Sequence, residues 1–263
     1  MGAENSQSAG VVKERKRIFL LGVPIDIIPE SEIEEAVRDL LDDGGKHHIV
    51  FLTLFDFLKA RGRGPYAHTV KQASLVIPTS LHILAGARYL GKSEPVRYMP
   101  FSFVIKLLGV LEKHGKSLYL VGLKSQPLHR TAANLRDSFP GLKIVGRYIG
   151  YFNGSQEQDV ITAIKKASPS LVLGGPGIKE RQHWFRTHRE ELPNSLFLWC
   201  GECFDIFAGL RKRISDKSWE KGTYWFSDIP RRPWKLLKVF HYLYYRLLLI
   251  IAKISSKRRK HHT

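Results

Sequence analysis

Residues 117–145 read SLYLVGLKSQPLHRTAANLRDSFPGLKIV, and this stretch decides the fold class. Its opening apolar run, at 117–122, is typical of a buried strand, and residues 127–138 repeat their apolar side chains with the period of a helix. A second short apolar run follows at 143–145. The order strand, helix, strand predicts two parallel strands joined by a helix.

The same alternation continues along the chain. We expect further buried strands at 18–23, 49–54, 75–77, 171–173 and 196–200, and further helices at 31–41, 101–113, 156–167 and 180–192. Ser31 followed by Glu34 predicts a capping box at the first of these helices. The pattern as a whole predicts a Rossmann-like α/β fold, a mostly parallel sheet with helices on both faces. Ligands of such sheets bind beyond the carboxyl ends of the strands.

The length of 263 residues is enough for one domain with an appendage. Residues 1–17 are polar, with no apolar face to bury, so we expect a flexible arm there. Residues 18–228 carry the alternating pattern and should form the α/β domain. Residues 229–263 should form a basic, amphipathic helical appendage.

The charge balance is unusual, since 42 Lys and Arg face 24 Asp and Glu for a net charge of +18. Such an excess favours a polyanionic partner. No acidic residue follows Asp228, whereas ten basic residues do. The rest of the chain is only mildly basic and shows no nucleic-acid-binding motif. We therefore predict an anionic membrane surface, and not nucleic acid, as the partner.

The appendage has helical periodicity. At about 100° per residue, its basic side chains gather on about one third of the circumference, and apolar side chains fill most of the rest. The basic residues that we expect to contact the membrane or the acceptor are Arg231, Arg232, Lys235, Lys238 and Arg246. Arg246 interrupts the apolar run, which favours a helix lying in the membrane interface over a spanning one. The alternative is an ordinary helix packed on the domain.

Cys200 and Cys203 form a C-x-x-C pair. A redox motif would need a thioredoxin-like context, and a zinc site would need two further ligands. We interpret the pair as small apolar residues at a strand end in a reducing compartment. Asp205 is interpreted as the cap of a helix that runs through Ala208. No metal-binding or phosphate-loop motif is found, so no metal is expected.

Several strand-end loops resemble the WecG/TagA/CpsF family of bacterial glycosyltransferases over residues 19–234. The most specific likeness is FPGLKIVG at 139–146 followed by GYF at 150–152. The segments LGVPID at 21–26 and FDIFAG at 204–209 add to it, as does Trp225 with Pro230 and Arg231.

The resemblance implies an enzyme, a glycosyltransferase that moves N-acetylmannosamine or a related hexose from a UDP-sugar to a lipid-linked acceptor in cell-envelope polysaccharide synthesis. It implies no cofactor, and a bacterial cytoplasmic protein bound peripherally to the inner face of the membrane. The oligomeric state stays open, a homo-oligomer included.

The catalytic positions depart from the family. The aspartate that follows a strand in the family falls at Thr79, and its asparagine falls at Leu54 or Phe55. A threonine hydroxyl is too weak a base to take a proton near neutral pH. Asp56 and Glu202, on other strand-end loops, are the candidate replacements. Otherwise the donor and reaction have changed, or the chain is an inactive pseudo-glycosyltransferase that acts as a membrane-associated binding or scaffolding subunit.

The candidate donor-binding residues also lie on strand-end loops. They are Gly122, Arg147, Gly150, Tyr151, Lys179, Arg181 and Gln182. The three cations suit a diphosphate, with surface solubility as the alternative. The glycines suit tight turns, whose free N–H groups could also bind phosphate. Tyr151 and Phe152 either stack on uracil or pack in the core.

Overall fold

The structure is a computed structural model that describes residues 15–222 and 238–260. Its centre is a six-stranded sheet in which every pair is parallel, in the order β4-β3-β8-β7-β5-β6. The strands are β3 (His47–Leu52), β4 (Leu75–Pro78), β5 (Ser117–Val121), β6 (Lys143–Tyr148), β7 (Leu171–Gly174) and β8 (Leu196–Trp199). The predicted α/β class and parallel sheet are confirmed.

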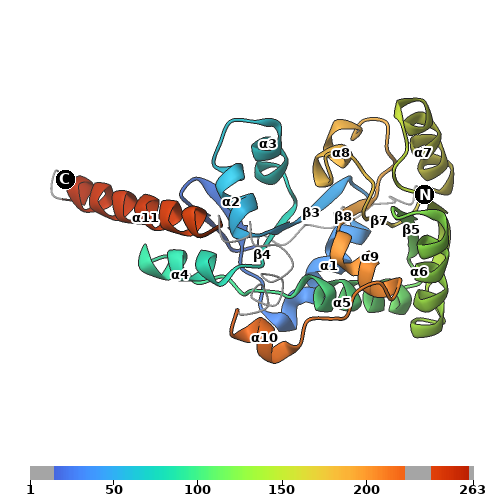
Figure 1. Cartoon of the computed structure of the whole chain (residues 1–263), viewed down its shortest axis with the longest axis horizontal. Helices are drawn as coiled ribbons and strands as arrows, with labels where there is room; N and C mark the ends of the chain where they lie inside the picture. The colour runs from blue at the N-terminus through green and yellow to red at the C-terminus, as the bar shows by residue number, and fades with distance from the viewer. Residues whose placement is uncertain (1–14, 223–237, 261–263) are drawn as a thin grey trace, which may run out of the picture.

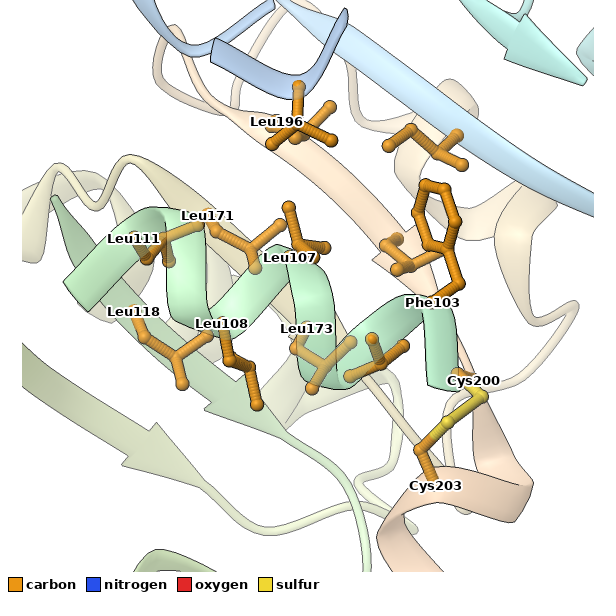
Figure 2. Close-up of a cluster of buried hydrophobic side chains, with 14 of the residues drawn as sticks. Phe103, Leu107, Leu108, Leu111, Leu118, Leu171, Leu173, Leu196, Cys200 and Cys203 are labelled. Atoms are coloured by element: carbon orange, nitrogen blue, oxygen red, sulfur yellow. A yellow bond between two sulfur atoms is a disulfide. The ribbon is translucent and has the colours of Figure 1, made fainter. Parts of the chain in front are cut away.

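Four helices cover one face of this sheet (Figure 1): α1 (Ile33–Asp42), α5 (Pro100–Lys113), α6 (Ser125–Ser138) and α9 (Gly201–Phe207). Successive side chains of a strand point to opposite faces of the sheet, so every second apolar residue of a strand packs against these helices. Leu171 and Leu173 face α5, as Figure 2 shows, while Val172 between them belongs to the core of the other face.

The opposite face carries α2 (Leu54–Ala60), α3 (Pro65–Lys71), α7 (Gly154–Ala167), α8 (Gln182–Thr187) and the C-terminal helix α11 (Lys238–Lys260). Helix α4 (Leu81–Tyr89) contributes Ile83 and Ala87 to the hydrophobic cluster that also contains Phe57 of α2 and Tyr245 of α11. A short 3-10 helix η1 (Glu30–Glu32) and helix α10 (Asp216–Glu220) complete the elements of the described residues. The sequence reading assigned no helix to α2, α3, α4 or α10.

The predicted single strand at 18–23 is instead an antiparallel hairpin of β1 (Arg17–Leu20) and β2 (Val23–Asp26). Leu21 and Gly22 have φ of 48° and 83°, and two left-handed residues reverse the chain in a tight hairpin turn. Buried Asp26 pairs with Arg17 at 2.7 Å and accepts the N–H of Val76 at 2.6 Å. The hairpin is thereby anchored to β4.

Two predicted helix starts were wrong. Ser31 lies inside η1, and α1 begins after Glu32 with no side-chain cap, because a capping residue needs an extended backbone that a wound segment lacks. The helix expected at 180–192 is only Gln182–Thr187, since Glu180 and Arg181 have φ of 58° and 52°. The capping box is found at α7 instead, between Asn153 and Gln156.

The interpretation of the C-x-x-C pair was also wrong. Cys200 and Cys203 form a disulfide across the first turn of α9, with Cα atoms 5.5 Å apart, inside the apolar core (Figure 2). Asp205 caps no helix start, because α9 begins at Gly201 with Cys200 as its N-cap. The backbone carbonyl of Asp205 instead accepts N–H groups from Leu210 and Arg211.

Candidate active site

The strand order brings four predicted site loops together at the carboxyl edge of the sheet. Thr79 follows β4, Asp56 lies just after β3, Glu202 follows β8, and the loop at 175–181 follows β7. These four strands are consecutive neighbours, and adjacent strands lie about 4.8 Å apart. Residues from distant parts of the chain therefore share one edge.

Asp56 lies in the first turn of α2, where Thr53 is the N-cap. The Thr53 hydroxyl donates to Asp56 Oδ2 at 2.5 Å, and the Asp56 N–H donates to Thr53 Oγ1 at 3.2 Å. Burial raises the pKa of Asp56, opposed by these hydrogen bonds and by the charges of Arg181 and Lys59. A carboxyl with a raised pKa at the ligand-binding edge of the sheet is a candidate general base.

Tyr66 and Gln182 lie beside this carboxylate and are both buried. Gln182 Nε2 donates to the Tyr66 hydroxyl at 2.9 Å, which joins α8 to α3. Burial raises the pKa of Tyr66, and the charge of Asp56 raises it further. Tyr66 therefore stays neutral with its O–H available as a donor.

Arg181 brings a cation to the same cluster. Its guanidinium lies over the Trp199 ring, 5.2 Å from the centroid, and Trp199 Nε1 donates to the Gly175 carbonyl at 3.1 Å. The left-handed backbone at Arg181 turns the chain out of the β7 loop just before α8 starts. Stacking on an aromatic face holds the guanidinium at the edge without using its in-plane N–H donors.

Thr79 is buried, with 4% of its surface exposed. Its N–H and its hydroxyl both donate to the Leu52 carbonyl, at 3.0 and 3.3 Å. The side chain thus fastens the end of β4 to the end of β3. It has no basic group to offer a substrate.

Glu202 lies in the first turn of α9, beside the disulfide, and its carboxylate is 4.0 Å from the Arg211 guanidinium. Its side chain is about one third exposed, at 29%. Glu202 is therefore a second carboxylate at the same edge as Asp56.

The glycine loops are packed against one another. A Cβ at Gly150 would lie 2.5 Å from the Pro176 carbonyl oxygen, and one at Gly122 would lie 2.9 Å from Gly175. The N–H of Gly122 donates to Tyr148 and that of Gly150 to Leu123. These two amides are therefore engaged by protein carbonyls, and the glycines permit the close crossing of three loops.

Of the two aromatic residues in this region, Tyr151 is 63% exposed and Phe152 is buried beside Trp184. The Tyr151 ring is thus open to a planar ligand, while Phe152 packs in the core. Lys179, on the β7 loop, is exposed.

Arg147 lies apart from this cluster. It is on the edge strand β6, exposed, with Nη2 3.1 Å from His129 Nδ1. Four strand spacings separate β6 from β3, about 19 Å at 4.8 Å each. The structure does not bring Arg147 together with Asp56.

Helix α11 has two apolar faces. Tyr245 and Leu249 are buried in the core with Phe57 of α2, and Gly86 of α4 lies so close that a Cβ there would collide with the Tyr245 hydroxyl. The opposite face is exposed, each side chain by half or more: Phe240, Leu243, Tyr244, Leu247, Ile251 and Ile254. None of the helices in the described residues is long and apolar enough to cross a membrane.

Only two of the five basic residues predicted to contact the membrane or the acceptor lie among the described residues. Arg231, Arg232 and Lys235 lie outside the described residues, and Lys238 is the first residue of α11. Arg246 is exposed and near His82, whose pKa is lowered by burial and then by this charge. Among residues 15–222 and 238–260, no cluster of His, Cys, Asp or Glu is arranged to hold a metal ion.

Sequence reasoning pointed to the loop at 53–56 but gave Thr53 no role, and it gave no site role to Tyr66 or Trp199. Thr53 three residues before Asp56 is a helix N-cap signal that could have been recognised. Tyr66 had no such signal, because α3 is short and only the packing of α3 on α8 brings it to the edge.

Comparison with known proteins gives a family match. The model of the glycosyl transferase WecG/TagA/CpsF family matches residues 18–262. The N-acetylglucosaminyldiphosphoundecaprenol N-acetyl-beta-D-mannosaminyltransferase of Bacillus subtilis (strain 168) is 22% identical over 193 residues, 73% of this chain and 74% of that protein. The Staphylococcus aureus (strain NCTC 8325 / PS 47) protein of the same name is 18% identical over 207 residues, 77% of this chain and 81% of that protein.

Proposed function

Because the chain belongs to the WecG/TagA/CpsF family of glycosyltransferases, we propose that it transfers an N-acetylmannosamine-type sugar, or a related hexose, from a UDP-sugar to a lipid-linked acceptor in bacterial cell-envelope polysaccharide synthesis. The named activity of the Bacillus subtilis relative supports this substrate class. The observation that carries the proposal is the cluster of Asp56, Tyr66, Arg181 and Gln182 at the carboxyl edge.

In the proposed reaction an acceptor hydroxyl attacks the anomeric carbon of the sugar. The bond from that carbon to the UDP β-phosphate oxygen breaks, and the hydroxyl proton passes to the carboxylate of Asp56. Negative charge develops on the UDP leaving group, where Arg181 and Lys179 are the available cations. Burial raises the pKa of Asp56, which makes its carboxylate a better proton acceptor than an ordinary surface carboxylate. We assign Tyr151, whose side chain is exposed, to stacking on the uracil.

The alternative is a catalytically inactive pseudo-glycosyltransferase that binds or scaffolds at the membrane. Thr79 favours it, because the position of the family aspartate is used here to bond the Leu52 carbonyl. Asp56 and Glu202 favour the enzyme, because each supplies a carboxylate at the same edge.

We propose further that α11 places the protein peripherally on the inner face of the cytoplasmic membrane. Its exposed apolar face points away from the domain core. Burying that face in lipid would be favourable by about 25 cal/mol for each Å² of apolar area removed from water. Arg246 and the other basic residues of the appendage would add attraction to anionic lipid.

Calorimetric titration of the full chain with a panel of UDP-sugars, with UDP release followed in the same samples, tests the function. Binding with turnover that Asp56→Asn reduces supports the proposal. Binding without turnover, also with a lipid-linked acceptor present, favours the alternative, and no binding of any UDP-sugar contradicts the donor assignment. Arg181→Gln should weaken UDP-sugar binding, and Arg147→Gln is its matched control, because it removes a cation of the same type away from the cluster.

A further inference from the structure

A cavity lies on the same face of the sheet as Asp56 but at the other end of the strands. It has a volume of about 450 Å³ and opens between α3 and α8, near the amino ends of β3 and β8. His48, the second residue of β3, lines it. Thr53 lies five positions after His48, about 17 Å along the strand at 3.3 Å per residue. The cavity is therefore distinct from the candidate active site.

The cavity is strongly cationic. Lys46, Arg186 and Arg189 line it, and none of the described residues that line it is acidic. Lys46 Nζ donates to the carbonyls of Arg189 and Glu190 at 2.8 and 3.2 Å, and Arg189 Nη2 donates to the Lys46 carbonyl at 3.3 Å. Arg186 Nη1 donates to Gln72 Oε1. All these acceptors are neutral, so the bonds position the three cations without cancelling their charge.

His48 supplies a second, independent observation. Its Nε2 is buried and has no hydrogen-bond partner in the described part of the chain. The ring lies edge-on to Phe185, with centroids 6.1 Å apart. Burial, and then the charge of Arg186, lower the pKa of His48 to about 3, so the ring is neutral. A buried polar atom without a partner is rare in folded proteins and calls for a ligand or solvent.

We propose that this cavity binds a small phosphorylated anion. The guanidinium groups of Arg186 and Arg189 and the ammonium of Lys46 would face the phosphate oxygens, and His48 Nε2 would supply a hydrogen bond. Guanidinium groups match phosphate geometry with paired N–H donors. The volume exceeds that of inorganic phosphate and is within the range of small-molecule sites, so an organic part such as a nucleoside fits.

The seam between α3 and α8 separates the two sites. Three polar contacts cross it in order: Tyr66 with Gln182, Thr69 with His183 at 2.8 Å, and Gln72 with Arg186. The first lies in the candidate active site and the last lines the cavity. An anion bound by the Arg186 guanidinium would compete with Gln72 Oε1 for its N–H groups. The anion site does not depend on the proposed glycosyl transfer.

Histidine side-chain NMR of the full chain, titrated with inorganic phosphate and separately with UMP, tests the inference. The His48 signal, identified by its loss in His48→Gln, should shift and saturate. Tighter binding of UMP than of phosphate would identify a nucleotide as the ligand class, and equal affinity would identify the phosphate alone. No saturable shift of His48 with either probe would overturn the proposal.

The matched variants are Arg186→Gln with Arg189→Gln, and Arg181→Gln as the control at the other site. The double variant should weaken the His48 response at least tenfold, while Arg181→Gln should leave it within twofold. Unchanged affinity in a folded double variant would contradict the assignment. If the double variant does not fold, the His48 shift in the unmodified chain decides.

Discussion

The side-chain amide of Gln182 donates a 2.9 Å hydrogen bond to the hydroxyl of Tyr66, and this contact joins two helices 116 residues apart in sequence. Both side chains are buried, so neither group can be left unpaired without cost. Gln182 begins α8, immediately after Arg181. The bond therefore fixes the position from which Arg181 reaches the carboxyl edge.

Tyr66→Phe should destabilise the protein and weaken donor binding. The Gln182 amide would lose its acceptor while still buried, at a cost of about 1–3 kcal/mol in unfolding free energy. The KM for the UDP-sugar should rise more than kcat falls, because Arg181 would be less well positioned. Denaturant unfolding and steady-state kinetics measure both effects. An unchanged KM with the expected loss of stability would remove Tyr66 from the donor site.

Asp56→Asn should lower turnover by ~10²-fold or more, as expected when acid–base assistance is lost. The Thr53 hydroxyl can still donate to the amide oxygen, so the fold should be kept. Glu202→Gln is the matched control, a carboxylate at the same edge paired with Arg211. UDP release in the presence of acceptor is the measurement. If only Glu202→Gln loses activity, the base is Glu202 and the proposed assignment is wrong.

Asp56 should also leave a signature in the pH dependence of stability. Its pKa in the folded state is raised above the unfolded value, mainly by burial. Its contribution to stability is therefore fully present below the unfolded pKa and is lost as pH rises through the folded pKa. Asp56→Asn should raise the Tm relative to the parent at neutral pH, and this gain should disappear in acid. A Tm difference that does not vary with pH would show that the carboxyl is not perturbed.

Thr79→Val should cost about 1 kcal/mol of stability through loss of one hydrogen bond, with turnover within about twofold. Thr79→Asp places a carboxylate where the family resemblance leads us to expect an aspartate, and turnover should rise or stay level. Its stability should fall, because the site is 4% exposed and faces the Leu52 carbonyl. Thermal melts and UDP release measure the two effects. Loss of activity in both folded variants would assign a chemical role to the hydroxyl.

Substitution on the exposed face of α11 should separate docking from folding. Leu243→Gln combined with Leu247→Gln should abolish sedimentation with anionic vesicles and leave the Tm unchanged, since both side chains are more than half exposed. High salt should release the unmodified chain only in part, because the apolar face is insensitive to screening.

The control for this pair is Tyr245→Ala, on the buried face of the same helix. It should lower the unfolding free energy by about 3 kcal/mol or more, as for other large-to-small core changes. Deleting α11 would be a poorer test, because it removes Tyr245 and Leu249 from the core. Equal sedimentation of the double variant and the parent would contradict membrane docking through this face.

The amino-acid sequence by itself determined the alternation of strands and helices and therefore the parallel sheet. Strands and helices show local periodicities of two and 3.6 residues in the sequence, and these periodicities can be recognised without any information on long-range contacts. The edge that carries Asp56, Thr79, Glu202 and Arg181 also followed, because strand ends in a parallel sheet share one edge.

Only the tertiary structure decided which of these loops are neighbours. The order β4-β3-β8-β7-β5-β6 places Arg181 beside Asp56 and leaves Arg147 on the far strand, although both are arginines on predicted strand-end loops. Likewise α11 is apolar around most of its circumference, so its pattern could not tell the face that buries Tyr245 from the face that exposes Leu247. Both outcomes depend on packing between segments far apart in the chain, and local periodicity holds no information about that.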